Sequence, residues 1–223
     1  MKIGIIVAME SELNLLMPLI DHVRETELEG TVFHEGNIGA HQVCVMQCGI
    51  GKVNAAMGAM KLIAHFSPEC VINSGVAGGT GSGAKVLDVV AGERVAYHDV
   101  WCGAPNERGQ VQGLPRFFCA DAGLLALLPA DKVKKGLIAS GDMFVDSAEE
   151  LQRIKSIYPD SIAVDMESAS IAQVCHAYNV PFISLRVVSD TPGEADNAAQ
   201  YNNFWQEAPR CTFEIIKEFI SKI

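Results

Sequence analysis

Several short runs of consecutive apolar residues, each followed by a helical pattern, limit most strongly what this chain can fold into. The runs IGIIVA at 3–8 and FISLRVV at 182–188 show no alternation of polar and apolar positions. A strand of this kind is buried on both faces, which is typical of sheets covered by helices. The pattern therefore predicts the α/β class, with helices flanking a central sheet.

The same patterns locate the remaining elements. Strands are predicted over 3–8, 70–73, 86–98, 135–140, 161–164 and 181–188, with a hairpin over 31–36 and 41–47. Helices are predicted over 11–20, 52–66, 147–157 and 167–178, and mostly over 199–221. The chain of 223 residues contains no repeat, low-complexity tract or linker, so we expect one domain, 1–223. The polar, glycine-bearing stretch 101–115 has no periodicity, which indicates a functional loop or a subunit contact.

Charge and cysteine content exclude several classes of function. Lys and Arg total 17 against 27 Asp and Glu, and the net charge of −10 argues against nucleic acid or an anionic membrane as partner. The seven cysteines are scattered without a CxxC pair, which argues against a structural metal and for reduced thiols. Glu10 and Glu12 follow the apolar start too early for a signal peptide, so we expect a cytoplasmic protein.

Acidic residues follow three of the predicted strands where each strand ends. Glu10 and Glu12 follow the first strand, Asp165 and Glu167 follow 161–164, and Ser189 and Asp190 follow 181–188. Ligands of α/β sheets bind outside the carboxyl ends of strands, so converging acids would form an anionic pocket. Each acid could instead lie at a helix N-terminus and interact with its dipole, an alternative that fits Glu10 and Asp165 well.

Common phosphate and acyl-transfer motifs are missing from the sequence. Gly51-Lys52 lacks the following Ser or Thr and the upstream glycine of a P-loop. The stretch 79–84 matches GxGxxA only loosely and precedes no clear helix, and there is no GxSxG motif. The sequence thus favours neither a dinucleotide site nor a serine hydrolase.

Six segments, in order, carry a resemblance to a known family. They are MKIGIIVAMESEL, CGIGKVNAA, INSGVAGG, SGDMFV, VDMESASIAQVCH and NVPFISLRVVSD. Together they resemble the 5′-methylthioadenosine/S-adenosylhomocysteine nucleosidases of the purine nucleoside phosphorylase superfamily. The resemblance implies a three-layer α/β/α domain with a mixed, twisted central sheet, and hydrolysis of an adenine N-glycosidic bond. It also implies a small-molecule nucleoside substrate, no cofactor and no metal, and a homodimer in which the 101–115 loop lies near the partner's site.

The resemblance assigns the central chemistry to three carboxylates. Glu12 would activate the attacking water, Asp190 would protonate the purine, and Glu167 would hold the ribose hydroxyls while Met166 packs on the sugar. This division is physically reasonable, because carboxylates stabilise an oxocarbenium-like sugar and a diol suits a carboxylate acceptor.

The resemblance assigns the rest of the pocket to neighbouring side chains. Phe144 would stack on adenine and the backbone of Val145 would read its edge, while the remaining wall would come from Ile50, Arg186, Ser189, Met9 and Tyr201. Taken without the resemblance, Phe144, Met9 and Met166 fit a hydrophobic core, Arg186 a buried ion pair and Ser189 a turn cap. For His98 we expect a structural or loop role.

Departures from the family pattern leave the substrate open. Val76 replaces a family serine whose hydroxyl Ser74 could supply, and the 101–115 loop is unusual. Tyr201 and Phe204 would close the pocket, with tyrosine where the family tends to have phenylalanine. A different 5′ group, as in a futalosine-type nucleoside such as aminofutalosine, therefore stays an alternative. A phosphate-dependent purine nucleoside phosphorylase and a non-catalytic nucleoside-binding protein are the other two.

Overall fold

The protein is built on one mixed sheet of ten strands. The computed structural model describes residues 1–193, 200–201, 204 and 209–223. Its strands are β1 (Lys2–Val7), β2 (Asp21–Leu28), β3 (Thr31–Ile38), β4 (His41–Gln47), β5 (Cys70–Gly79), β6 (Val89–Tyr97), β7 (Phe118–Cys119), β8 (Val133–Ser140), β9 (Ser161–Asp165) and β10 (Phe182–Asp190). Their order is β10-β6-β8-β9-β5-β1-β4-β3-β2, with β7 paired to β6 off this path. Parallel pairs such as β1 with β4 and antiparallel pairs such as β3 with β4 confirm the mixed sheet.

Strand β5 closes part of this sheet into a ring. It pairs in parallel with β1 and β10, and its last residues, Gly78 and Gly79, pair antiparallel with β9. Since β10 pairs with β6, β6 with β8 and β8 with β9, the circuit is complete. The ring brings the ends of β5, β9 and β10 together beside the end of β1.

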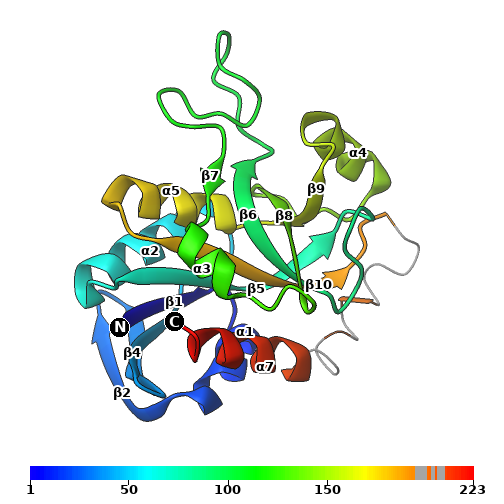
Figure 1. Cartoon of the computed structure of the whole chain (residues 1–223). Coiled ribbons are helices and arrows are strands. Elements are labelled where there is room, and N and C mark those ends of the chain that lie inside the picture. The colour runs from blue at the N-terminus through cyan, green and yellow to red at the C-terminus, as the bar shows by residue number, and fades with distance from the viewer. Residues whose placement is uncertain (194–199, 202–203, 205–208) are drawn as a thin grey trace.

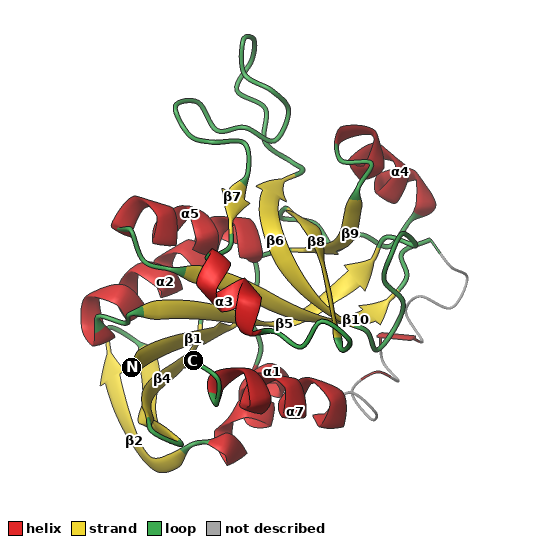
Figure 2. Ribbon diagram, in the orientation of Figure 1, coloured by secondary structure: helices red, strands yellow, loops and turns green. Residues whose placement is uncertain are grey.

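Helices cover both faces of the sheet (Figures 1 and 2). They are α1 (Glu10–Leu16), the short 3₁₀ helix η1 (Met17–Leu19), α2 (Lys52–Phe66), α3 (Ala122–Leu127), α4 (Ala148–Ile157), α5 (Ser168–Tyr178) and α7 (Pro209–Ile220). One core packs Leu16, Leu124 and Phe219 of α1, α3 and α7 against the strands, and the opposite core packs Leu62 of α2 and Ile171 of α5. Burying one such side chain contributes about 1.5–3 kcal/mol, so these two layers carry most of the fold.

Most predicted elements are present, and the differences have local causes. The predicted helix over 11–20 gives way to η1 after Leu16, because Pro18 has no N–H with which to continue the α-helical ladder. The strand predicted over 70–73 continues to Gly79 through a glycine-rich half without apolar periodicity. Strand β2 and helix α3 were not predicted. The helix predicted over 199–221 lies partly outside the described residues, with α7 covering its second half.

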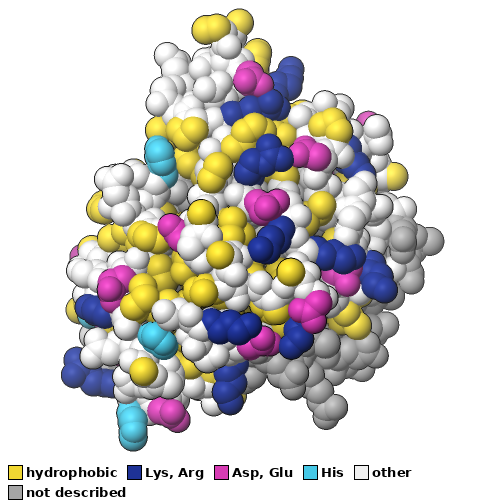
Figure 3. Space-filling model, viewed as in Figure 1, with side chains coloured by type: hydrophobic (Ala, Val, Ile, Leu, Met, Phe, Trp, Pro, Cys, Tyr) yellow, Lys and Arg dark blue, Asp and Glu magenta, His cyan; other side chains and the backbone are white. Residues whose placement is uncertain are grey.

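The 101–115 loop leaves the end of β6 and projects from the body of the molecule without a helix or strand (Figure 1). On the face shown in Figure 3, acidic and basic side chains are interspersed. Among the helices of the described residues, none is long and apolar enough to cross a membrane.

Candidate active site

A pocket opens where β1, β5, β9 and β10 end. Eleven residues that the sequence analysis placed in the site line it: Met9, Glu12, Ile50, Phe144, Val145, Met166, Glu167, Arg186, Ser189, Asp190 and Tyr201. Residues 76–78 of β5 supply a further wall. The four carboxylates that line the pocket come from three different strand–helix junctions. The acids that follow the strands therefore converge on one pocket, as their positions in the sequence predicted.

Glu12 is held rigidly at the start of α1. Its Oε2 accepts hydrogen bonds from the backbone N–H groups of Ala8 at 2.8 Å and Met9 at 3.0 Å, and its Oε1 accepts one from Val76 at 3.0 Å. These three dipoles fix the carboxylate where it faces the pocket. Burial raises the pKa of Glu12, an effect that nearby Arg186 and the three N–H groups only partly offset. A buried carboxylate with a raised pKa is a stronger base than a solvated one.

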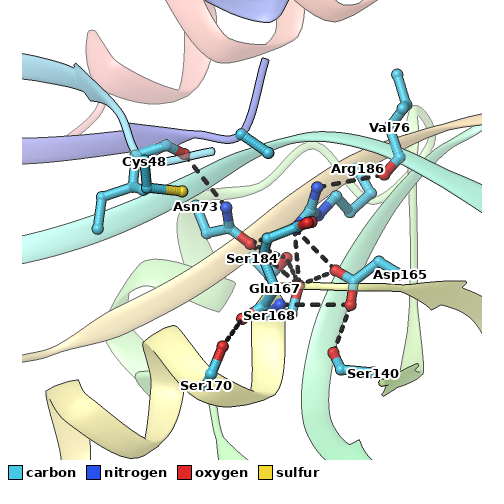
Figure 4. A network of polar contacts seen from close by, with 12 residues as sticks. Cys48, Asn73, Val76, Ser140, Asp165, Glu167, Ser168, Ser170, Ser184 and Arg186 are labelled. Carbon is cyan, nitrogen blue, oxygen red and sulfur yellow. Dashed lines mark hydrogen bonds and ion pairs between the residues drawn. The ribbon is translucent and has the colours of Figure 1, made fainter. Parts of the chain in front are cut away.

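Arg186 lies at the centre of a buried polar network (Figure 4). Its Nη2 is 2.9 Å from Asp165 Oδ2, 3.2 Å from Glu167 Oε2 and 2.7 Å from Asn73 Oδ1, and its Nη1 donates to Val76 O at 3.2 Å. The two alternatives left open for Arg186 therefore both hold, because this buried ion-pair partner also lines the pocket. Its Nε has no hydrogen-bond partner among the described residues.

Asp165 agrees with the helix-dipole alternative, since its Oδ1 accepts from the N–H of Ser168, the first residue of α5, at 3.3 Å, and it has a second role as well. It is buried, and besides Arg186 it accepts hydrogen bonds from the hydroxyls of Ser140 and Ser168. These contacts make it the partner that holds the guanidinium. Glu10 is exposed in the first turn of α1, also in agreement with the helix-dipole alternative.

Glu167 connects this network to the start of α2. Its Oε1 accepts from the Gly51 N–H at 3.0 Å while its Oε2 faces Arg186. Burial raises the pKa of Glu167, although the Arg186 guanidinium opposes the shift. The carboxylate therefore has one oxygen on a helix N-terminus and one on a cation, a fixed orientation suited to accepting hydrogen bonds from a ligand.

A second group of polar residues fixes the 141–145 turn, which carries Phe144. Asp142 Oδ1 accepts from the Lys52 N–H at 2.6 Å, and the Asp142 N–H donates to Asp99 Oδ2 at 2.9 Å. The same Asp99 oxygen accepts from Lys52 Nζ at 2.7 Å. The sequence analysis missed Asp142 and Asp99, because their partners are distant in the chain and no spacing motif marks them.

Aromatic and sulfur-bearing side chains form another part of the pocket wall. Phe144 is 50% exposed, so it is not the core residue that composition alone allows, and its ring meets that of Tyr201 edge-on at 5.8 Å. The Tyr201 hydroxyl lies 3.6 Å from Met9 Sδ. Val145 is buried behind Phe144. An apolar wall beside carboxylates suits a flat heteroaromatic ligand with a polar sugar.

Three further predictions can be compared with the structure. Val76 lines the pocket, but Ser74 is buried and is not among the lining residues, so Ser74 does not replace the missing hydroxyl. His98 lies at the base of the 101–115 loop, outside this pocket. Phe204 packs in the hydrophobic core with residues of α7 and is not among the lining residues, so the prediction that it closes the pocket is wrong.

Within the described ranges, no three His, Cys, Asp or Glu side chains are grouped as a metal ion requires.

The fold and the acid-lined pocket define a protein of the phosphorylase superfamily, whose sequence model matches residues 2–221. A 5′-methylthioadenosine/S-adenosylhomocysteine nucleosidase of Desulfotalea psychrophila is 36% identical over 230 residues, covering 100% of this chain and 98% of the relative. The S-adenosylhomocysteine nucleosidase of Streptococcus pyogenes, solved with 5-methylthiotubericidin, superposes with a TM-score of 0.95 at 35% identity, covering 100% of this chain and 97% of that one. A futalosine hydrolase mutant of Helicobacter pylori superposes with a TM-score of 0.91 at 30% identity, covering 100% and 99%. The chain belongs to the 5′-methylthioadenosine/S-adenosylhomocysteine nucleosidase family.

Proposed function

We propose that this protein hydrolyses the N-glycosidic bond of 5′-methylthioadenosine and S-adenosylhomocysteine, releasing adenine and the 5′-thioribose. The observation that carries the proposal is the convergence of Glu12, Glu167 and Asp190 on one pocket with an aromatic wall. A protein that only bound a nucleoside would not need a buried base and a buried acid on opposite sides of its ligand. The family relationship supports the same reaction.

Glu12 is the proposed base. It accepts a proton from a water molecule whose oxygen then bonds to C1′ of the ribose. Three N–H groups hold the Glu12 carboxylate in place, and burial still raises its pKa above the usual value, so it stays basic. As the bond from C1′ to N9 breaks, the sugar becomes oxocarbenium-like, and the surrounding carboxylates stabilise its positive charge.

Asp190 is the proposed acid. It donates a proton to N7 of adenine, and the electron pair of the broken bond stays on the purine, which leaves as neutral adenine. The Ser189 hydroxyl lies 2.6 Å from Asp190 Oδ1 and 3.2 Å from Ala77 O. It can donate to the ionised carboxylate, or donate to Ala77 and accept from the protonated carboxyl, so it suits both states of the acid.

The other residues position the substrate. Glu167 accepts hydrogen bonds from the ribose hydroxyls and Met166 packs on the sugar, while Arg186 holds Glu167 and lies near the water. Phe144 stacks on the purine and the Val145 backbone reads its edge. Ile50, Met9 and Tyr201 surround the 5′ group. Each role rests on the presence of the residue in the pocket wall.

Water is a better nucleophile than phosphate for this pocket. Arg186 is the one Lys or Arg among the described lining residues, and Asp165 and Glu167 already occupy it. A phosphate dianion would meet four carboxylates without a free cation to bind it. We therefore expect adenine release from methylthioadenosine in phosphate-free buffer, and strict dependence on added phosphate would contradict the proposal.

Two variants test the acid and the base. Glu12→Gln and Asp190→Asn keep the shape of each side chain but remove its proton chemistry. Each should lower kcat by about 10²–10⁴-fold, the usual contribution of one acid–base group, with unchanged circular dichroism. A near-normal rate in either variant would remove that residue from its role.

The 5′ substituent separates this activity from its nearest alternative. Similarity to a futalosine hydrolase motivates testing aminofutalosine as well. A panel of 5′-substituted adenosines, assayed by adenine release, should rank the methylthio and homocysteinyl compounds first. A higher kcat/KM for aminofutalosine would assign the protein to that related reaction.

We also propose a cytoplasmic homodimer. Val53, Met57 and Met60 recur on one side of α2 with exposed fractions of 68%, 52% and 48%, an apolar strip suited to a second copy of the chain. The projecting 101–115 loop would then lie near the partner's pocket. The cysteines that the structure describes are all free, which fits a reducing compartment. Sedimentation of the Met57→Glu variant should show a monomer if this strip is the interface.

A further inference from the structure

A second cavity lies between the base of the 101–115 loop and α4. Its volume is about 330 Å³, well above the roughly 30 Å³ that one water occupies in the liquid. It is lined by His98, Asp99, Val100, Trp101, Arg108, Arg153, Ser156 and Ile157. None of these residues lines the candidate active site.

The cavity has an excess of positive charge. Neither the Arg108 nor the Arg153 guanidinium has an ion pair or hydrogen bond to any residue that the structure describes. Arg108 stacks over the Trp101 ring at 4.8 Å, which holds the plane of the guanidinium and leaves its N–H groups available. Two arginines without an acidic partner are unexpected in a chain with 27 acids and 17 basic residues.

The single carboxylate of this cavity is already neutralised. Asp99 Oδ2 accepts from Lys52 Nζ at 2.7 Å and from the Asp142 N–H at 2.9 Å. Burial acts to raise the pKa of Asp99, but these two hydrogen bonds together with the electrostatic effects of Lys52 and His98 leave the pKa below its usual value. Asp99 therefore does not supply the missing partner of Arg108 or Arg153.

His98 gives an independent indication of a missing ligand. Its side chain is 2% exposed, it lines the cavity, and neither ring nitrogen has a hydrogen-bond partner among the described residues. A buried polar group without a hydrogen-bond partner destabilises the fold, and a ligand that supplies the partner removes that cost. Burial also lowers the pKa of His98, so in the free protein the imidazole is neutral and has one N–H to donate.

We propose that this cavity is a binding site for a phosphoryl dianion, either free phosphate or a phosphate monoester. Arg108 and Arg153 would bind its oxygens from the two sides of the cavity, since the planar guanidinium matches phosphate geometry. His98 would donate to a third oxygen and so gain its missing partner. The site stands apart from the proposed hydrolysis, and its existence does not depend on that reaction.

The test is a titration of the assembled protein with inorganic phosphate and, separately, with ribose 5-phosphate. Binding is measured by calorimetry and by NMR of the His98 imidazole, which a His98→Gln variant assigns. A bound dianion should raise the pKa of His98. The groups that already act on this pKa are Asp99 and Asp165, which raise it, and Arg153 and Lys52, which lower it.

Charge-removing variants identify the site. Arg108→Gln and Arg153→Gln, both exposed and therefore expected to fold, should each weaken binding by roughly 10- to 100-fold, the effect of one charge-assisted contact. Arg24→Gln, an exposed arginine on β2, is the matched control and should bind normally. Saturation of the active site with adenine should leave phosphate binding unchanged.

Each outcome has a definite meaning. Tighter binding of ribose 5-phosphate identifies a monoester ligand, and tighter binding of inorganic phosphate identifies the free ion. No binding of either at about 10 mM, equal binding in the double arginine variant, or competition by adenine would overturn the proposal. Hydrolysis in phosphate-free buffer is measured separately, so failure here leaves the proposed function untouched.

Discussion

Replacing Gly75 with alanine should disable the proposed base without unfolding the protein. A Cβ built on Gly75 would lie 2.3 Å from Arg186 Nη1, 2.6 Å from Glu12 Oε1 and 3.2 Å from Glu12 Cδ. Both neighbours are buried and held by several hydrogen bonds, so neither can rotate away. The backbone of β5 approaches the two side chains this closely only because position 75 has no side chain.

The size of the effect follows from these distances. Reaching an ordinary contact of about 3.5 Å requires a shift of about 1 Å at Arg186 or Glu12. Misplacing a reacting group by that amount lowers the rate by about 10²-fold, and overpacking a buried site costs about 1–3 kcal/mol of stability. We therefore expect kcat/KM for methylthioadenosine to fall by about two orders of magnitude while the protein stays folded.

The assay is adenine release, run below the Tm of the variant, with thermal unfolding measured in parallel. Gly123→Ala is the matched control, because Gly123 is exposed in the first turn of α3 and its Cβ would meet only Asp121 Oδ1, at 3.1 Å. This control should keep full activity and change stability by no more than about 1 kcal/mol. A folded Gly75→Ala protein with unchanged kcat/KM would refute the assigned positions of Glu12 and Arg186.

Three further predictions concern the polar groups around the pocket. Asp142→Ala should raise KM more than it lowers kcat, because it releases the 141–145 turn from Lys52, and Asp142→Asn, which keeps the acceptor oxygen, should largely restore KM. Arg186→Met leaves Asp165 buried without its cation and should lower the free energy of unfolding by about 3–5 kcal/mol, as chemical denaturation would measure. The raised pKa of Glu167 means that the folded protein binds more protons than the unfolded chain above pH 4.5. Its contribution to stability is thus fully present below pH 4.5 and is lost as pH rises through the folded-state pKa, so Glu167→Gln should flatten this part of the stability profile.

The sequence predicted the buried strands well because their signal is local. Strand β1 has five buried residues in succession, so its apolar run marks it without knowledge of its neighbours. Strand β2 has no buried residue and lies at the sheet edge, paired with β3, so its sequence DHVRETEL gives no such signal. The second half of β5 also lacks an apolar pattern that would predict a strand. Its small residues allow the ring to close and allow Glu12 and Arg186 to approach the backbone at Gly75.

The site also has features that the sequence predicts and features that it does not. Glu12 and Asp190 could be predicted to converge, because β1 and β10 both run parallel to β5 and the ends of parallel strands share one edge of a sheet. The acids after β9 reach the same pocket for another reason, since β9 runs antiparallel to β5 and only the ring closure places its end there. The identity of the polar partners could not be predicted, since Lys52 and Asp142 are 90 residues apart and Arg186 meets Asn73 across 113 residues. The positions of the acids in the sequence indicated an anionic pocket. Only the folded chain shows that the guanidinium of Arg186 pairs with Asp165 and Glu167.

That pairing explains how four similar carboxylates can perform different tasks. Arg186 is within 4 Å of Asp165 and Glu167, the residues that we assign to positioning and to the ribose, and it fixes their charge and orientation. Glu12 instead has three backbone N–H groups and no Lys, Arg or His nitrogen within 4 Å among the described residues. Asp190 has the Ser189 hydroxyl as its neighbour, which can donate a hydrogen bond to the ionised carboxylate or accept one from the protonated carboxyl. Because environment rather than residue type separates the base, the acid and the ribose ligand, exchanging Glu12 and Asp190 for each other's side chains should not preserve activity.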